Sequence, residues 1–376
     1  MQEVYITRMA KYLPYDPVSN DEMESVLGMV DGKPSKVRAL ILRNNGIKTR
    51  YYAFREGQKS FSNAELTAEA VKALFDNDKE LEQVQLLACG TTSPDQTLPS
   101  HASMVHGQLG LPPLALFSFS GACNTGMQSF KYAYLSVASG DTDNAVATGS
   151  ERMSKYLTSD KFQAEIDKVH EIEENGYIAF EKDFLRWMLS DGAGAAFFQN
   201  KPSEDGLSLK VEWIDMTSFA GEIDTCMYSG GIKDGERLIG YNELPTSDWL
   251  TQSVFSMKQD TRLLGEHIVP RGVDFLEQVM KKRNFDTREV DWFLPHLSSE
   301  FFRKKISEEL ERRNIPLPLN LWYTNLDRLG NVGSASAYFM LEELMNQGKL
   351  KKGQKVFLMV PESARFSYTY ALLTVV

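Results

Sequence analysis

Cys123 is the residue of this chain whose surroundings best suit covalent chemistry. It lies in the stretch FSFSGACNTGMQSF (117–130), where an apolar run ends in small residues and a helical pattern begins. A turn from strand to helix would place its sulfur at a helix N-terminus, where unpaired N–H groups and the helix dipole favour a thiolate and could hold an oxyanion. Cys123 is therefore a candidate nucleophile, and the alternative is a buried, unreactive cysteine.

A nucleophilic cysteine needs groups that move protons or stabilise charge, and two positions offer them. His296 ends the apolar segment VDWFLPHLSS, directly after a proline. Asn331 lies in NLDRLGNVGSAS, where the glycines on both sides let the backbone bend and expose the amide, although a turn asparagine is the alternative. The remaining histidines and cysteines are expected to be core, interface or surface residues without a catalytic role: His101, His106, His170, His267, Cys89 and Cys226.

Composition limits the classes of protein to which the chain can belong. Its 376 residues are 42% hydrophobic and 24% charged, which is typical of a globular protein with a sizeable core. A net charge of −10 argues against nucleic acid as a partner. Three widely spaced cysteines argue against a disulfide framework and a metal site. Charges interrupt every apolar run, and the N-terminus has no apolar signal region, so we expect a cytoplasmic protein without a membrane span.

Strand and helix patterns alternate along the chain, which predicts an α/β protein with largely parallel sheets covered on both faces. The pattern occurs twice, so we expect two halves, 1–200 and 201–376. Charged stretches near 155–186 and 219–262 are expected to be insertions. The expected strands, several of which deliver polar residues at their C-terminal ends, are 84–92, 114–121, 144–151, 193–200, 288–299 and 354–363.

The motifs around Cys123, His296 and Asn331 form an ordered set with GTTSPDQTLPS (90–100), SDGAGAAFF (190–198) and GKLKKGQKVFLM (348–359). This set closely resembles the β-ketoacyl-acyl-carrier-protein synthase III group of the thiolase fold. The resemblance covers nearly the whole chain. It implies a five-layered αβαβα fold, a homodimer, and no cofactor. The acyl thioester substrates would be carried on the phosphopantetheine of an acyl-carrier protein or on coenzyme A.

The resemblance also implies roles for individual residues. Cys123 accepts the first acyl chain as a thioester, and His296 and Asn331 stabilise the enolate of the second substrate. The backbone N–H that aligns with Ala364 is the other expected oxyanion donor. Leu98 is expected to reach across the dimer to close the partner's acyl pocket. Phe366 is also assigned to the substrate pocket.

The chain departs from the family pattern near the expected site. Gln-Ala-Asn after the histidine is replaced by Leu297, Ser298 and Ser299, and a triple-glycine loop by PESARFSY (361–368). The charges of Glu362 and Arg365 are expected to pair with each other or to contact substrate. The segment KVRALILRNNGIKTR (36–50) lacks a tryptophan that would stack on adenine, which favours a carrier protein over coenzyme A. The expected docking residues are Arg303, Lys304 and Lys305.

The charged loop and the insertions resemble a specialised branch that makes dialkylresorcinol or stilbene precursors. Its members join two acyl chains by Claisen condensation and close a cyclohexanedione ring in an aldol-type step. Glu362, Arg365, Glu151 and Arg152, together with the Ala364 amide, are candidates for that second step. Three alternatives stay open: an ordinary initiating synthase, a ketosynthase-like O- or N-acyltransferase, and a non-catalytic partner subunit.

Overall fold

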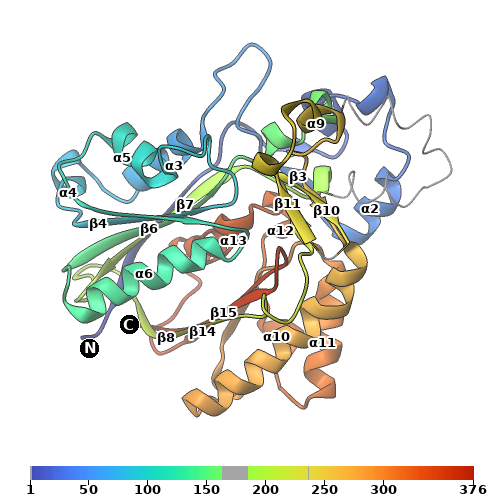
Figure 1. Ribbon diagram of the computed structural model, residues 1–376. Coiled ribbons are helices and arrows are strands. Elements are labelled where there is room, and N and C mark those ends of the chain that lie inside the picture. Colours follow the sequence, from blue (N-terminus) through green and yellow to red (C-terminus); the bar gives the residue numbers. More distant parts are fainter. Residues whose placement is uncertain (1, 163–184, 236) are drawn as a thin grey trace.

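The computed structural model describes residues 2–162, 185–235 and 237–376, and its centre is a nine-stranded mixed sheet (Figure 1). The strand order is β13-β14-β15-β8-β1-β7-β6-β4-β5. These strands are β1 (Tyr5–Tyr12), β4 (Leu86–Thr91), β5 (Ala115–Ser120), β6 (Asn144–Glu151), β7 (Gly192–Gln199), β8 (Leu209–Ser218), β13 (Trp292–Pro295), β14 (Lys355–Glu362) and β15 (Ser367–Val375).

The sheet has two parts that meet at β1. Strand β1 pairs with β7 along most of its length but with β8 only through Tyr5 and Ile6. The pairs β4–β5, β4–β6 and β13–β14 are parallel, whereas the other five pairs are antiparallel. The expectation of largely parallel sheets was wrong. Hydrophobic runs mark a strand as buried, but they do not encode which way its neighbour runs.

Helices cover the two parts of the sheet in layers. One apolar cluster combines α6 and α13 with strands from both parts, so these two helices form the central layer. Helices α3 and α5 pack on the outer face of the N-terminal part, and α10 and α11 on that of the C-terminal part. The larger helices are α2 (Arg38–Asn45), α3 (Asn63–Lys72), α5 (His101–Leu109), α6 (Thr125–Ser139), α10 (Thr261–Arg283), α11 (Phe301–Arg312) and α13 (Ser336–Asn346). This is the five-layered thiolase fold.

Shorter elements lie at the edges of these layers. The short helices are α1 (Met23–Leu27), α4 (Asp78–Leu81), α9 (Thr246–Thr251) and α12 (Leu326–Leu329). The short strands are β2 (Val18–Ser19), β3 (Thr49–Arg50), β9 (Met227–Tyr228), β10 (Gly231–Asp234), β11 (Arg237–Gly240) and β12 (Lys258–Gln259).

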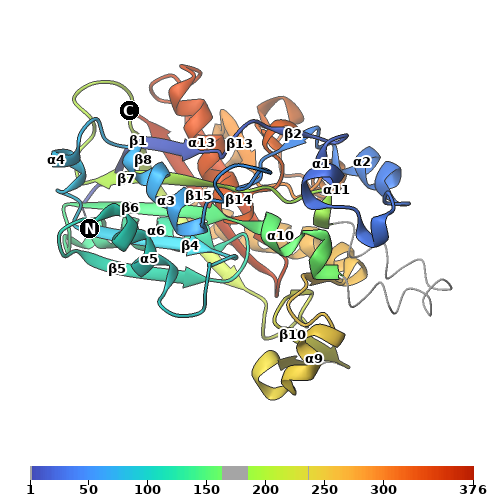
Figure 2. The same cartoon turned by 90° about the horizontal axis from the view of Figure 1, so that it is seen from above.

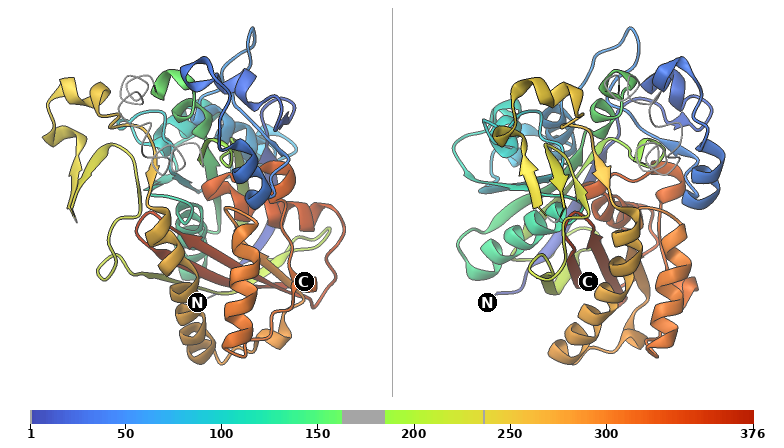
Figure 3. Two further views of the ribbon diagram at one scale, coloured as in Figure 1. Left: turned by 90° about the vertical axis from the view of Figure 1, so that its right-hand side faces the viewer. Right: turned by 45° about the vertical axis from the view of Figure 1, so that its right-hand side comes forward.

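Part of the second expected insertion projects from the body of the molecule. We call residues 226–235 and 237–260 the cap; it contains the pairs β10–β11 and β12–β9 and helix α9. In Figure 2 the cap segment that carries β10 and α9 extends away from the layers, and the left view of Figure 3 shows the same projection. In the first expected insertion, residues 163–184, including His170, lie outside the described residues.

In the described ranges, no helix combines the length and apolar composition needed to cross a lipid bilayer.

Candidate active site

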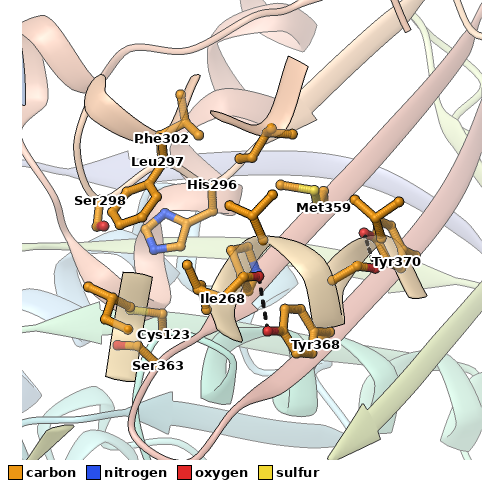
Figure 4. Close-up of a pocket in the computed structure, with 16 residues that line it drawn as sticks. Cys123, Ile268, His296, Leu297, Ser298, Phe302, Met359, Ser363, Tyr368 and Tyr370 are labelled. Carbon is orange, nitrogen blue, oxygen red and sulfur yellow. Dashed lines mark hydrogen bonds between the residues drawn. The ribbon is translucent and has the colours of Figure 1, made fainter. Parts of the chain in front are cut away.

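Cys123 lies in the short connection between β5 and α6, with Asn124 as the residue before the first helical turn. Its side chain lines a narrow cavity of about 50 Å³ with His296, Ser298 and Ser363 (Figure 4). The rest of the wall is mainly apolar and comes from α10, α11 and the C-terminal strands. A cavity of this kind can enclose a carbon chain beside the sulfur.

His296 follows directly after β13, and its backbone N–H donates to the Met359 carbonyl on β14 at 2.8 Å. This bond fixes the residue at the edge of the sheet, and the ring lines the same cavity as Cys123 (Figure 4). Burial lowers the pKa of His296 to about 4. The imidazole is therefore neutral at pH 7, with one nitrogen able to donate and the other able to accept.

Asn331 lines a second, adjoining cavity that also contains Cys123 and Ser363. Its backbone is anchored on both sides, because its N–H donates to Met188 at 2.9 Å and its carbonyl accepts from Ser190 at 2.9 Å. The side-chain Oδ1 accepts from the Gly333 N–H at 3.0 Å. The amide nitrogen Nδ2 has no protein partner in the described ranges, so it is free to donate to a bound oxygen.

Two glycines, one in α6 and one on β6, let the Asn331 loop approach these elements closely. A Cβ added at Gly126 or Gly149 would lie 2.0 or 2.2 Å from the Ser334 carbonyl oxygen. Neither position therefore accepts a larger residue unless the loop moves. This close packing holds the Asn331 loop against β6 and the start of α6.

The environment of Cys123 differs from the sequence-based expectation of a thiolate. Burial raises the pKa of the Cys123 thiol, and the charges of Glu151 and Glu362 raise it further. The contribution of the helix N-terminus is outweighed, because removing the sulfur from water disfavours its charged form. The thiol of the free protein is therefore protonated at pH 7.

Glu151 is fully buried at the end of β6 and borders the cavity that contains Asn331. It accepts hydrogen bonds from the Thr92 backbone and hydroxyl, the Ser93 hydroxyl and the Ser334 N–H. Burial raises its pKa despite these bonds. The Arg152 side chain lies elsewhere. It lines a separate outer pocket, and its Nη1 is 3.4 Å from Asp95 Oδ1.

The loop between β14 and β15 differs from two expectations. The Ala364 N–H, expected to face an oxyanion, instead donates to Glu362 Oε1 at 2.6 Å. Glu362 Oε2 accepts from the Ser367 hydroxyl at 2.6 Å. The expected Glu362–Arg365 ion pair is absent from the described part of the chain, where the exposed Arg365 donates to the Ile223 carbonyl at 3.4 Å.

The two residues assigned to the substrate pocket lie outside both cavities that contain Cys123. Leu98 is 83% exposed on the loop before α5. Phe366 is fully buried and packs against the His267 ring, with the centroids 5.6 Å apart. Phe366 therefore contributes to the core behind the site rather than to its surface.

The expected docking residues lie on α11, and they differ in how freely they could bind a partner. Arg303 is held by Glu300 through two hydrogen bonds of 2.5 and 2.9 Å. Lys304 is highly exposed and lies 3.5 Å from Glu308. Lys305 lies over the Phe301 ring, 4.5 Å from its centroid. Lys304 and Lys305 are thus the more available cations.

The sequence did not reveal that Ser298 and Ser363 both line the two cavities around Cys123. Both replace residues of the family pattern, and that departure was the available signal. The outer pocket, of about 800 Å³, was also missed; Trp249 and Phe255 of the cap form part of its wall. Across the described ranges, no group of three or more His, Cys, Asp or Glu side chains is arranged to hold a metal ion.

Comparisons with known proteins identify the family that the chain resembles. Residues 280–373 match the model for the C-terminal part of 3-oxoacyl-[acyl-carrier-protein] synthase III, and residues 45–183 match the N-terminal domain of thiolase. The chain is 26% identical to β-ketoacyl-[acyl-carrier-protein] synthase III 1 of Deinococcus radiodurans, over 96% of this chain and 90% of the relative.

Solved structures share the fold over the whole chain. AbyA1, a tetronic acid condensing enzyme, is similar with a TM-score of 0.75 and 17% identity, covering 99% of both chains. A variant of OleA of Xanthomonas campestris, solved with bound lauric acid and lauroyl-coenzyme A, is similar with a TM-score of 0.74 and 18% identity, again over 99% of both chains.

Proposed function

The chain belongs to the β-ketoacyl-acyl-carrier-protein synthase III-like ketosynthases, which condense acyl thioesters, and we propose that it joins two acyl chains at Cys123 and then closes a ring. The observation that carries the proposal is the grouping of Cys123, His296 and Asn331 around two adjoining cavities. The carboxylate of Glu362 lies near enough to raise the pKa of the thiol.

The first half of the proposed reaction loads an acyl chain on Cys123. The sulfur attacks the thioester carbonyl, and the carrier thiol departs with the proton that Cys123 gives up. Since the thiol is protonated in the free protein, a base must remove that proton as the substrate binds. Neutral His296, which lines the same cavity as the sulfur, is the proposed acceptor. Because burial lowers its pKa, the proton must pass on to the departing thiol as the sulfur attacks.

The second half forms the carbon–carbon bond. A malonyl thioester that loses carbon dioxide, or a β-ketoacyl thioester that loses an α-proton, becomes an enolate. The N–H of His296 and the Nδ2 of Asn331 supply two donors for its oxygen. The enolate carbon attacks the acyl carbonyl on Cys123, and the cysteine sulfur departs.

Ring closure requires a second deprotonation of the joined chain, and Glu362 is the proposed base. Its carboxylate oxygens are held by the Ala364 N–H and the Ser367 hydroxyl, so its position is fixed. A carbanion of the bound chain would then attack a carbonyl of the same molecule in an aldol-type step. The product would be a cyclohexanedione precursor of a dialkylresorcinol or stilbene.

Product identification tests this function. Purified protein would receive an acyl thioester and a β-ketoacyl or malonyl thioester, carried on acyl-carrier protein, and the products would be identified by mass spectrometry with carbon-13 labels. We expect a cyclised product from the wild type and an uncyclised condensation product from Glu362→Gln. A linear β-keto product from the wild type would instead identify an ordinary synthase. An ester or amide without a new C–C bond would identify an acyltransferase.

The size of the cavity favours a second candidate, the ordinary initiating synthase. Its 50 Å³ offers room for about four water molecules, which corresponds to a short acyl group. Long chains would require the side chains from α10 and α11 to move. Rates measured across a series of acyl chain lengths separate the candidates, since an initiating synthase should react best with the shortest donors.

The edge strand β5 supports a homodimer. Among the described strands, β5 pairs only with β4, so its other edge has unpaired backbone groups that another strand could bind. Leu98 projects from a neighbouring loop with most of its surface exposed. We expect light scattering of the purified protein to give twice the mass of the chain; a monomer mass at micromolar concentration would contradict this.

A further inference from the structure

The loop that follows β14 does not offer its Ala364 N–H to the substrate. That N–H donates to Glu362 Oε1 at 2.6 Å, so it already has a charged acceptor. The tetrahedral intermediate formed at Cys123 nevertheless needs hydrogen-bond donors for its oxyanion. A side-chain donor close to the sulfur would supplement the N–H groups at the start of α6 in place of this amide.

The hydroxyl of Ser363 meets the geometric requirements. Ser363 lines both cavities that contain Cys123, and its side chain lies beside Cys123 in Figure 4. Its Oγ accepts a hydrogen bond from Gln259 Nε2 at 3.1 Å. Because Gln259 occupies a lone pair of the hydroxyl, the hydroxyl proton remains available. In the described part of the chain that proton has no acceptor.

We infer that Ser363 donates its hydroxyl proton in a hydrogen bond to the oxyanion at Cys123, and that Gln259 positions it. This assignment rests on the proposed function of Cys123. As the Cys123 sulfur bonds to the thioester carbon, the carbonyl electron pair moves to oxygen, where the Ser363 hydroxyl stabilises it. When the intermediate collapses, the carbonyl reforms and the bond to the departing sulfur breaks. Ser363 keeps its proton throughout.

Gln259 is held firmly enough to act as a positioning residue. It is buried at the base of the cap, on β12, which pairs with β9. The N–H groups of Cys226 and Met227 donate to the Ala364 carbonyl at 2.9 and 3.2 Å. The cap and the loop are thus joined by two backbone hydrogen bonds to the residue that follows Ser363.

The test compares four variants in the rate at which Cys123 is acylated. Acetyl and octanoyl thioesters of coenzyme A and of the carrier protein would be mixed with each protein, and the acyl-enzyme followed by intact mass. We expect Ser363→Ala to lower the maximal rate by about 10²- to 10³-fold with little change in the donor concentration for half-maximal rate. Ser139→Ala is the control, because this serine is exposed at the C-terminal end of α6 and lines neither cavity around Cys123; we expect a change below about threefold.

Two substitutions of Gln259 test the direction of the hydrogen bond. Gln259→Glu keeps the size of the side chain but offers only acceptors at pH 7, so it would draw the Ser363 proton away from Cys123. We expect a loss as large as that of Ser363→Ala. Gln259→Leu removes the partner without redirecting the proton and should cause a smaller loss. Unchanged thermal midpoints would establish that each variant is folded.

The outcomes distinguish a failure of the roles assigned to Ser363 and Gln259 from a failure of the proposed function. A wild type that acylates while Ser363→Ala acylates equally fast overturns the role of Ser363 and leaves the proposed function standing. Equal rates for Gln259→Glu and Gln259→Leu overturn the role of Gln259. A wild type that accepts an acyl group from neither donor overturns the proposed function, and the assignment of Ser363 with it.

Discussion

Two regions of this molecule build one site in different ways. Cys123, His296 and Asn331 lie where strands or helices of the layered core end, and we call these positions the frame. The cap consists of short strands, turns and helix α9, and the loop that it contacts, residues 362–367, joins the ends of β14 and β15. The frame carries the residues proposed for acyl transfer, whereas the cap and the loop supply Gln259 and Ser363, which we assign to the oxyanion.

The two regions are also stabilised differently. Frame residues are anchored by backbone bonds inside the core, as at His296 and Asn331. Helix α9 of the cap has no buried residue, and Trp249 packs mainly on Tyr241 and Phe255 of the cap itself. Changes in the frame should therefore affect chemistry or folding, and changes at the tip of the cap should affect binding.

The largest effect is expected from Asn331→Ala. Loss of one of two donors to the enolate should lower the rate of condensation by about 10²- to 10³-fold, while acylation of Cys123 persists. Single-turnover measurements of each step would check this. Asn346→Ala, an exposed asparagine on α13, is the control. If Asn331→Ala kept full activity, a direct acyl transfer to an alcohol or amine would replace the proposed condensation.

Glu343→Gln should destabilise the frame without touching the substrate. Glu343 is buried on α13 and accepts from Tyr323 at 2.7 Å and Arg328 at 3.0 Å. Burial opposes its ionisation, but the bonds from Arg328 and Tyr323 outweigh burial and lower its pKa to about 2. Loss of the charge should reduce the free energy of unfolding by roughly 2–3 kcal/mol at pH 7, as measured by urea denaturation.

The sign of the pH dependence follows from the lowered pKa. The wild-type contribution of Glu343 is complete above its unfolded pKa, near 4.3, and is lost as pH falls toward about 2. The difference in stability between wild type and Glu343→Gln should therefore shrink over that interval. A difference that stayed constant from pH 7 to pH 3 would show that the ionised carboxylate is not the cause.

Trp249→Ala should have the smallest effect on activity, and it tests whether the tip of the cap contributes to binding alone. This side chain lines the outer pocket with Arg152 and Lys155, away from the sulfur. We expect KM for a carrier-linked donor to rise about three- to tenfold with kcat unchanged, as is typical of lost binding that is equal in ground and transition states. A fall in kcat alone would mean that the tip of the cap affects the chemical steps, contrary to the expectation that it affects only binding.

The positions of the frame residues could be predicted from the sequence, whereas their electrostatic environment and the contacts of the cap and the loop could not. Cys123 was recognisable because a strand ending in small residues before a helical period encodes a narrow turn, and His296 because a proline ends its strand. The protonation of Cys123 was not recognisable, because it depends on burial and on Glu151 and Glu362, which are distant in sequence.

In the loop formed by residues 362–367, the side-chain contacts could not be predicted from residues that are close in sequence. The spacing of Glu362 and Arg365 favours an ion pair, but the backbone between β14 and β15 reverses direction, with Phe366 at a φ of 59°. Glu362 bonds back to the loop, and Arg365 points toward solvent near the approach to the cap. The contacts of Gln259 with Ser363 span residues about a hundred positions apart, which no local pattern encodes.

Acylation of Cys123 is the central claim, and intact-protein mass spectrometry tests it most directly. Wild type and Cys123→Ala would each be mixed with matched acyl-coenzyme A and acyl-carrier-protein thioesters. We predict that the wild type gains the mass of one acyl group from at least one donor and that Cys123→Ala gains none. An acyl group that remains on Cys123→Ala, or a wild type that accepts none from either donor, would contradict the account.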